Sequence, residues 1–173
     1  MFDSTYEVFK VSRLGAFGRD FHKEVLLYRF DAKEGERYLI YVTEYPENFF
    51  TIDFCRNKSR NSKNKWTEIS GLSDAVKVLS TVTHLMIDLL KAGYEEGVCF
   101  GFIGARMDSE EDQETSKRFR VYRKIMLNLI DRNAFYHLED PSIDAYLIVN
   151  PKADLNKVLT TARHAFAKEN EEE

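Results

Sequence analysis

The chain has 173 residues, of which 43% are hydrophobic and 31% charged, with a formal net charge of −4. These proportions are those of a globular domain. They exclude disordered, collagen-like and low-complexity chains, which lack the apolar surface that offsets the entropy of folding. The acidic balance argues mildly against a chain that is basic throughout, as non-specific nucleic-acid binders usually are. No apolar run reaches the roughly 18 residues of a membrane helix, and no signal peptide is evident, so we expect a cytoplasmic protein without a membrane contact.

The first half of the chain predicts an antiparallel meander. Runs rich in aromatic and β-branched residues occupy positions 25–30, 37–45 and 49–55, and short polar turns separate them. In the third run Phe50 and Phe54 alternate with polar neighbours, which is typical of a half-buried strand. A further strand is expected near residues 7–13.

Helices and strands alternate in the second half. The helical spacing of apolar residues predicts a helix from Ser73 to Gly93, with Ser73 as its N-cap. A strand at 98–105, a helix from Thr115 or Ser116 to Asp131, strands at 134–138 and 144–149, and a final amphipathic helix from about Leu155 follow. We therefore expect one α/β (strictly α+β) domain, residues 1–168, in which helices pack on a mixed, mostly antiparallel sheet. Residues 169–173 are expected to form an acidic tail.

This element order, over residues 20–150, resembles the GCN5-related acetyltransferase fold. The resemblance implies that the amides of Gly71, Leu72 and Ser73 hold the pyrophosphate of acetyl-CoA at a helix N-terminus. It also implies that Tyr122 acts as the general acid and that Glu44 lies beside the acceptor site. The segment carries one glycine where the family has two small positions, and Asp74 adds a negative charge there. The spacing of Tyr122 suits a core residue equally well.

A second resemblance covers most of the chain. The strings at residues 43–50, 70–82, 100–105 and 117–122 resemble an uncharacterised group of bacterial and phage or mobile-element proteins. That group carries no established activity. The resemblance implies an accessory role in a mobile element.

Two basic segments are the most conspicuous feature. The first, followed by an aromatic side chain, comprises Arg56, Lys58, Arg60, Lys63, Lys65 and Trp66. The second forms one face of a predicted helix and comprises Lys117, Arg120 and Lys124. Cations followed by an aromatic suit phosphate contacts and base stacking. A solvated hairpin and a solvated helix face are the plain alternatives, and five acids at positions 108–114 oppose the second segment.

Other chemistry has weaker support. Glu44 and Asp53 lie on adjacent predicted strands and form a candidate carboxylate pair for acid–base work. The four histidines show no metal-site spacing, and no nucleophile elbow or phosphate-binding loop motif is present. Cys55 and Cys99 are expected to be buried free thiols.

We therefore predict a non-catalytic binding or accessory protein whose basic surface engages nucleic acid or a protein partner, with no cofactor. One alternative is an acyl-CoA-dependent N-acyltransferase that uses acetyl-CoA. The other is a structural, self-associating accessory protein.

Overall fold

The structure is a computed structural model that describes residues 3–15, 24–62, 72–104 and 115–171. Predictions made for Lys63, Lys65, Trp66 and Gly71 lie outside these residues. The described helices and strands are β1 (Phe9–Gly15), β2 (Glu24–Asp31), β3 (Arg37–Tyr45), β4 (Phe49–Arg56), α1 (Leu72–Ala92), β5 (Cys99–Ile103), α2 (Lys117–Leu129), β6 (Tyr136–Asp140), β7 (Ala145–Val149) and α3 (Leu155–Glu171).

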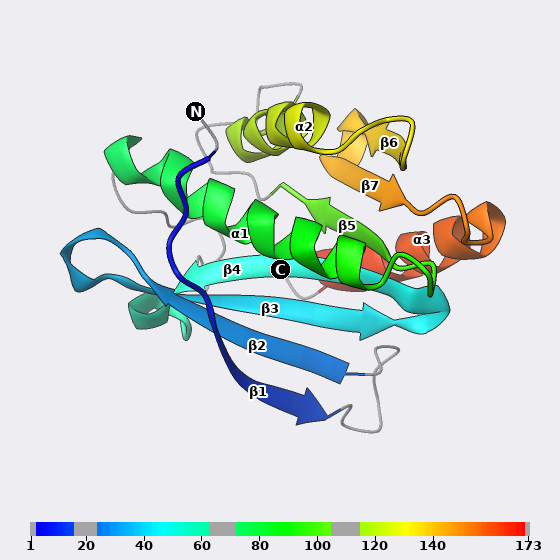
Figure 1. The fold of residues 1–173 in the computed structure, drawn as a ribbon. Helices are drawn as coiled ribbons and strands as arrows, with labels where there is room; N and C mark the ends of the chain where they lie inside the picture. Colours follow the sequence, from blue (N-terminus) through cyan, green and yellow to red (C-terminus); the bar gives the residue numbers. More distant parts are fainter. Residues whose placement is uncertain (1–2, 16–23, 63–71, 105–114, 172–173) are drawn as a thin grey trace.

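The strands form one seven-stranded sheet in the order β1-β2-β3-β4-β5-β7-β6 (Figure 1). Neighbouring strands are antiparallel except β4 and β5, which are parallel and connected through α1. This confirms the predicted single α+β domain and its meander, and the parallel pair is what makes the sheet mixed. The β4–β5 ladder spans only Phe49–Cys99 to Thr51–Gly101, although both strands continue beyond it.

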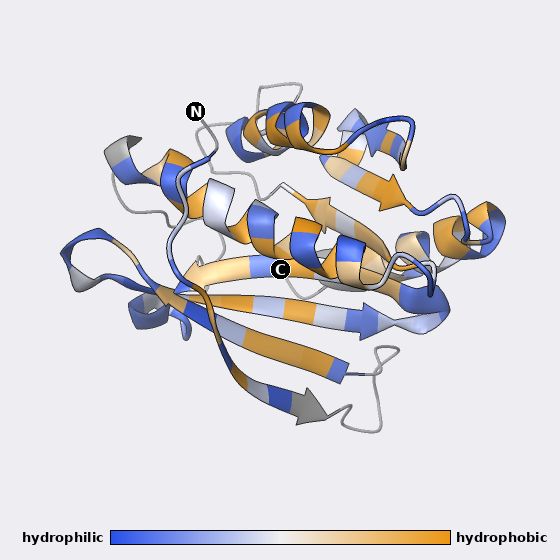
Figure 2. Cartoon of the chain, viewed as in Figure 1, coloured by the Kyte–Doolittle hydropathy of each residue, from blue (hydrophilic) through white to orange (hydrophobic). Residues whose placement is uncertain are grey.

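The helices cover the two faces of the sheet unequally. The larger core joins inward residues of α1 and α2, such as Met86 and Ile125, to Phe54 and Phe100 of the sheet. The smaller core lies on the opposite face, where Phe166 of α3 packs against β4, β5 and β7. Figure 2 shows the apolar stripes of α1 and α2 turned toward the sheet and their polar residues turned outward. Burial of these stripes is what holds the layers together.

Residues 3–8 form a strap that crosses α1 before the chain enters β1 (Figure 1). The Tyr6 N–H donates to Thr81 Oγ1 at 2.9 Å, and the Tyr6 hydroxyl donates to Asp74 Oδ1. Its ring stacks on Phe30 at 5.8 Å, and the Lys77 ammonium lies 4.1 Å from the ring centroid. The N-terminal residues therefore both cover a helix and complete the sheet, two roles that the sequence left open.

Two boundaries differ from expectation. Helix α1 begins at Leu72, so Ser73 lies in its first turn rather than at the cap. Helix α3 continues to Glu171, into the segment predicted as an acidic tail, because glutamate is a good helix former. Within the described residues, no helix has the length and apolarity needed to cross a membrane.

Candidate functional site: a basic end of the sheet

The topology gathers the predicted basic segments at one end of the sheet. Strand β2 ends where β3 begins, β4 runs antiparallel to β3, and β5 runs parallel to β4. The ends of β2, β4 and β5 and the starts of α1 and α2 therefore share one side of the molecule (Figure 1). We call this side the basic end. In the general case of an open α/β sheet, ligands bind at the carboxyl ends of parallel strands beside a crossover.

The first basic segment is partly neutralised by a carboxylate that the sequence analysis missed. Arg56 Nε lies 2.7 Å from Glu36 Oε1, and Lys58 Nζ lies 3.3 Å from Glu36 Oε2. The hydrogen bond from Arg56, assisted by that from Lys58, lowers the pKa of Glu36 against the effect of burial. Two cations thus share one carboxylate and leave a net positive charge. The turn at 31–36 was the available signal, since it leads into β3, where Tyr38 pairs with Arg56.

Two further cations, Arg29 and Arg37, lie beside Asp31 at the start of the same turn. Arg37 Nε lies 2.8 Å from Asp31 Oδ1, and Arg29 lies 3.3 Å from Asp31 Oδ2. The hydrogen bond from Arg37 lowers the pKa of Asp31. Again two guanidinium groups share one carboxylate. Arg60 lies further along the chain and is exposed, and its guanidinium donates a long hydrogen bond to Asn57 at 3.5 Å.

The start of α2 is fixed tightly to the end of β5. The Ser116 Oγ accepts from the Phe119 N–H at 3.0 Å as the N-cap and donates to the Gly104 carbonyl at 3.2 Å. The Ser116 N–H donates to Asp144 Oδ1 at 3.0 Å. A Cβ at Gly104 would stand 2.7 Å from the Phe119 nitrogen, so only glycine allows this approach. These contacts confirm Ser116 as the cap and position the second basic segment.

Arg118 connects the two basic segments. Its guanidinium lies 4.7 Å from the ring centroid of Phe54 in β4, two residues before Arg56. Phe54 and Arg56 point to the same face of the sheet because they are two residues apart in one strand. Lys117 and Arg120 are exposed beside Arg118, and Arg120 donates to the Thr115 carbonyl at 2.7 Å. Lys124 is also exposed, but it lies two turns further along α2.

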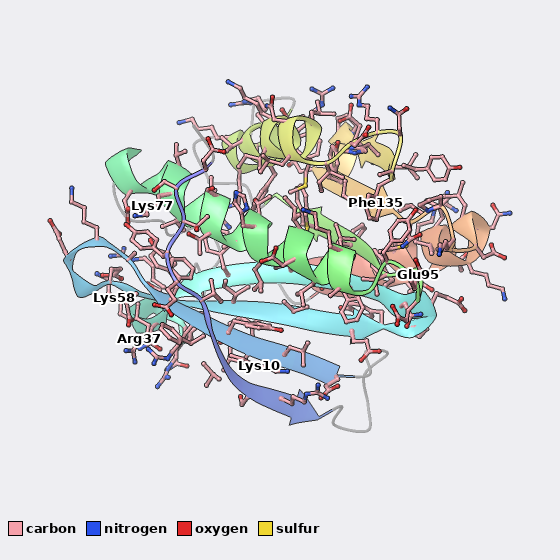
Figure 3. All side chains as sticks on the ribbon, viewed as in Figure 1. Lys10, Arg37, Lys58, Lys77, Glu95 and Phe135 are labelled. Atoms are coloured by element: carbon pink, nitrogen blue, oxygen red, sulfur yellow. The ribbon has the colours of Figure 1, made fainter. Side chains whose placement is uncertain are left out.

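The basic end contains more cations than carboxylates among the described residues. Figure 3 shows Arg37, Lys58 and Lys77 on this side, and Glu95 on the other. The cations are Arg29, Lys33, Arg37, Arg56, Lys58, Arg60, Lys77, Lys117, Arg118 and Arg120, and the carboxylates are Asp31, Glu34, Glu36, Asp53, Asp74, Asp140 and Asp144. The five acids at 108–114 lie outside the described residues. This end therefore suits an extended polyanion that can contact many cations.

The predicted general acid lies in the core, and the predicted carboxylate pair is not formed. Tyr122 is 5% exposed and packs on Phe102 at 4.4 Å, and burial raises its pKa strongly. Asp53 pairs with Tyr41, whereas Glu44 pairs with Phe50. The predicted Glu44–Asp53 pair is therefore wrong: an odd offset in register places the two carboxylates on opposite faces of the sheet.

The first turn of α1 already contains a carboxylate. Asp74 is 7% exposed and accepts the hydroxyl hydrogen of Tyr6. A carboxylate at this position interacts favourably with the helix dipole and repels a second anion. The segment predicted to bind pyrophosphate, residues 71–73, is therefore followed directly by a carboxylate that opposes the binding of an anion.

The remaining features concern the cysteines, metal binding and the hollows of the surface. Cys55 and Cys99 are free and buried, as expected, and burial raises the pKa of Cys99 to about 11. No cluster of metal-binding side chains occurs among the described residues. Two open hollows, of about 330 and 360 Å³, border β6 and the strap, and none of the predicted site residues lines them.

Comparison of the chain with protein-family models, curated proteins and solved structures finds no match. The two resemblances stated above therefore remain predictions.

Proposed function

We propose that this protein is a non-catalytic binding protein whose basic end holds nucleic acid. The observation that carries the proposal is the contact of Arg118 with Phe54, which places the second basic segment at the same end of the sheet as the first. Cations spread over a strand end, a turn and a helix start match the repeating charge of a phosphate backbone. An accessory role in a mobile element, as the second resemblance implies, is compatible with this activity.

A charge-reversal experiment tests the proposal. Arg60→Glu/Lys117→Glu changes one exposed cation in each basic segment, and Lys91→Glu/Lys157→Glu changes two exposed lysines at the opposite end by the same net charge. Fluorescence anisotropy with labelled single-stranded RNA, single-stranded DNA and duplex DNA measures affinity over a series of salt concentrations. We expect the first variant to lose about tenfold or more in affinity and to show a shallower salt dependence. The control variant should stay close to wild type.

Three results would overturn the proposal. These are absence of binding to all three probes, affinity that does not change with salt, and equal losses in the two double variants. Absence of binding would direct attention to an acidic protein partner, the other partner that the sequence suggested. Equal losses would show that net charge, rather than the basic end, governs the interaction.

An acyl-CoA-dependent transferase is the second candidate. The β4–β5 ladder ends after three residue pairs while both strands continue, at the end of the sheet where α1 begins. That favours a ligand between the strands, whereas buried Tyr122 and the carboxylate of Asp74 oppose acetyl transfer there. Millimolar acetyl-CoA, at 100 times its dissociation constant, would stabilise the fold by about 2.7 kcal/mol and raise Tm by several degrees. An unchanged Tm would eliminate this candidate, and turnover retained in Tyr122→Phe would eliminate the role assigned to Tyr122.

A further inference from the structure

The exposed apolar side chains of the described residues gather mainly at the two edges of the sheet. At one edge Phe9 and Val11 of β1 are 42% and 48% exposed. Around the other edge, β6, Tyr136 is 55%, Ile143 41% and Leu155 40% exposed. An exposed edge strand presents backbone groups that can pair with another chain. Apolar residues beside such an edge mark an interaction site.

The surroundings of β6 fit a binding partner better than those of β1. Strand β1 shifts register between Lys10 and Ser12, an irregularity that protects edges from pairing. Strand β6 pairs with β7 without a shift from Tyr136 to Asp140. The hollow of about 330 Å³ beside it is lined by residues that include Tyr136, Leu138 and Leu155. The β6 edge is thus regular and exposed, with Tyr136 at its start, the apolar Ile143 and Leu155 nearby, and the carboxylates Glu139 and Asp140 at its end.

We propose that β6 pairs antiparallel with β6 of a second copy of this chain, on a two-fold axis at Leu138. This register places Tyr136 opposite Asp140, His137 opposite Glu139, and Leu138 opposite itself. Like charges therefore do not face each other across the axis. The exposed residues at the two ends of the strand, Tyr136 and the nearby Ile143, approach each other between copies. An isologous contact needs this self-complementarity.

The predicted association is weak. Strand β6 has five residues, so the interface falls at the small end of specific protein contacts, below about 1,200 Å². We expect a reversible dimer with a dissociation constant of about a micromolar or more. The pairing extends the sheet of each copy. Its contacts reach Asp140 at the rim of the basic end but include none of the cations proposed to hold nucleic acid, so the two interactions use different residues.

Sedimentation velocity from low micromolar to near millimolar concentration tests the proposal. Wild type should shift from monomer to dimer, and Tyr136→Lys and Ile143→Glu should each weaken the dimer about tenfold or more. Combining the two substitutions should restore association, because the new lysine and glutamate then face each other between copies. Phe9→Lys, at the other edge, is the matched control and should leave the dimer unchanged. Circular dichroism checks the fold of every variant.

Cross-linking provides a second readout. A two-fold axis at Leu138 brings the two Cα atoms of that residue within disulfide range, so Leu138→Cys should form a covalent dimer under mild oxidation with diamide. Wild type should not, because Cys55 and Cys99 are buried. A monomer at every concentration would overturn the proposal, as would a dimer broken by Phe9→Lys but not by Tyr136→Lys. Failure of both the double variant and the cysteine variant would overturn the register.

Discussion

The two ends of the sheet differ in charge although they are built from the same strands. At the basic end, Asp31 and Glu36 each serve two cations. At the opposite end, where β3 turns into β4 and α1 stops, carboxylates prevail among the described residues. There Lys152 pairs with Glu95, and Glu44, Glu47, Glu96 and Asp154 add negative charge. The net charge of −4 is therefore distributed unevenly over the two ends of the sheet. The ratio of cations to carboxylates at each end decides what that end can bind.

The largest expected loss of stability comes from Gly104→Ala, which adds a methyl group at the basic end. Gly104→Ala forces the new Cβ against the Phe119 nitrogen and Ser116 Oγ, which are both held in place, and we expect a loss of about 3 kcal/mol. At the other end, the new Cβ of Gly93→Ala would stand 2.3 Å from Val98 Cγ2, 2.9 Å from Val98 Cβ and 3.4 Å from the Leu89 carbonyl oxygen, and the half-buried Val98 has to shift to relieve these contacts. Urea unfolding of the two variants should rank Gly104→Ala as more damaging. Equal losses would show that the start of α2 is less rigid than its contacts indicate.

A hydroxyl on the strap gives an intermediate effect. Tyr6→Phe keeps the stacking on Phe30 but removes the donor to Asp74 and the acceptor for the Lys33 N–H, which lies at 3.2 Å. Leaving a buried carboxylate with one partner fewer should cost about 1.5 kcal/mol. Thermal unfolding measures the loss. No loss would mean that water replaces the hydroxyl and that the strap does not hold α1.

The N-cap of α2 should matter slightly less. Ser116→Ala removes the acceptor for the Phe119 N–H and should cost about 1 kcal/mol. Ser116→Asp keeps an acceptor at the cap but adds a charge in a fully buried site next to Asp144. It should therefore be worse than alanine. Equilibrium unfolding in urea compares the two variants, and an aspartate that rescues stability would contradict the packing described for this cap.

The smallest expected effect is the pH dependence of stability that Glu36 contributes at the basic end. The folded-state pKa of Glu36 is below its ordinary value of 4.5, mainly through Arg56. The stabilisation is therefore present above pH 4.5 and is lost as pH falls through the depressed pKa. Glu36→Gln should remove this pH dependence, which amounts to less than about 1 kcal/mol. It should also tighten nucleic-acid binding about severalfold by releasing two cations.

Glu95→Gln is the matched control, because Glu95 also pairs with a cation, Lys152, but at the opposite end. It should leave nucleic-acid affinity unchanged. Thermal unfolding across the acid range and anisotropy at fixed salt provide the two measurements. An equal gain of affinity in both variants would remove the distinction between the ends.

The sequence predicted the elements well because their signals are local. The alternation of Phe50, Ile52 and Phe54 identified β4. The predicted helix after it permitted a parallel pairing with β5, which the structure has. The sequence could not show that β7 lies between β5 and β6, because a hairpin can add to a sheet by either strand. The Glu44–Asp53 error was avoidable: a three-residue turn sets Tyr45 against Phe49, which fixes the parity of every later pair.

The candidate site was predicted only in part. The basic residues were visible, but their proximity depends on Arg118 reaching Phe54, a contact between residues 64 positions apart. The pairing of Glu36 with Arg56 was missed because the two residues are 20 positions apart and meet only when β3 and β4 pair. Tyr122 had the spacing of a core residue, and its burial agrees with that interpretation rather than with the role implied by the acetyltransferase resemblance.

The short parallel ladder between β4 and β5 also has a consequence for how the chain folds. The meander from β1 to β4 can form through contacts between neighbours in sequence, whereas the β4–β5 pairing needs the chain from residue 57 to residue 98, including α1, to close first. Such non-local closure is slow. Until it is complete, the edge of β4 remains unpaired and Phe50, Ile52 and Phe54 lack their cover. We therefore expect an intermediate with a formed meander that is prone to aggregate and that matures when α1 docks.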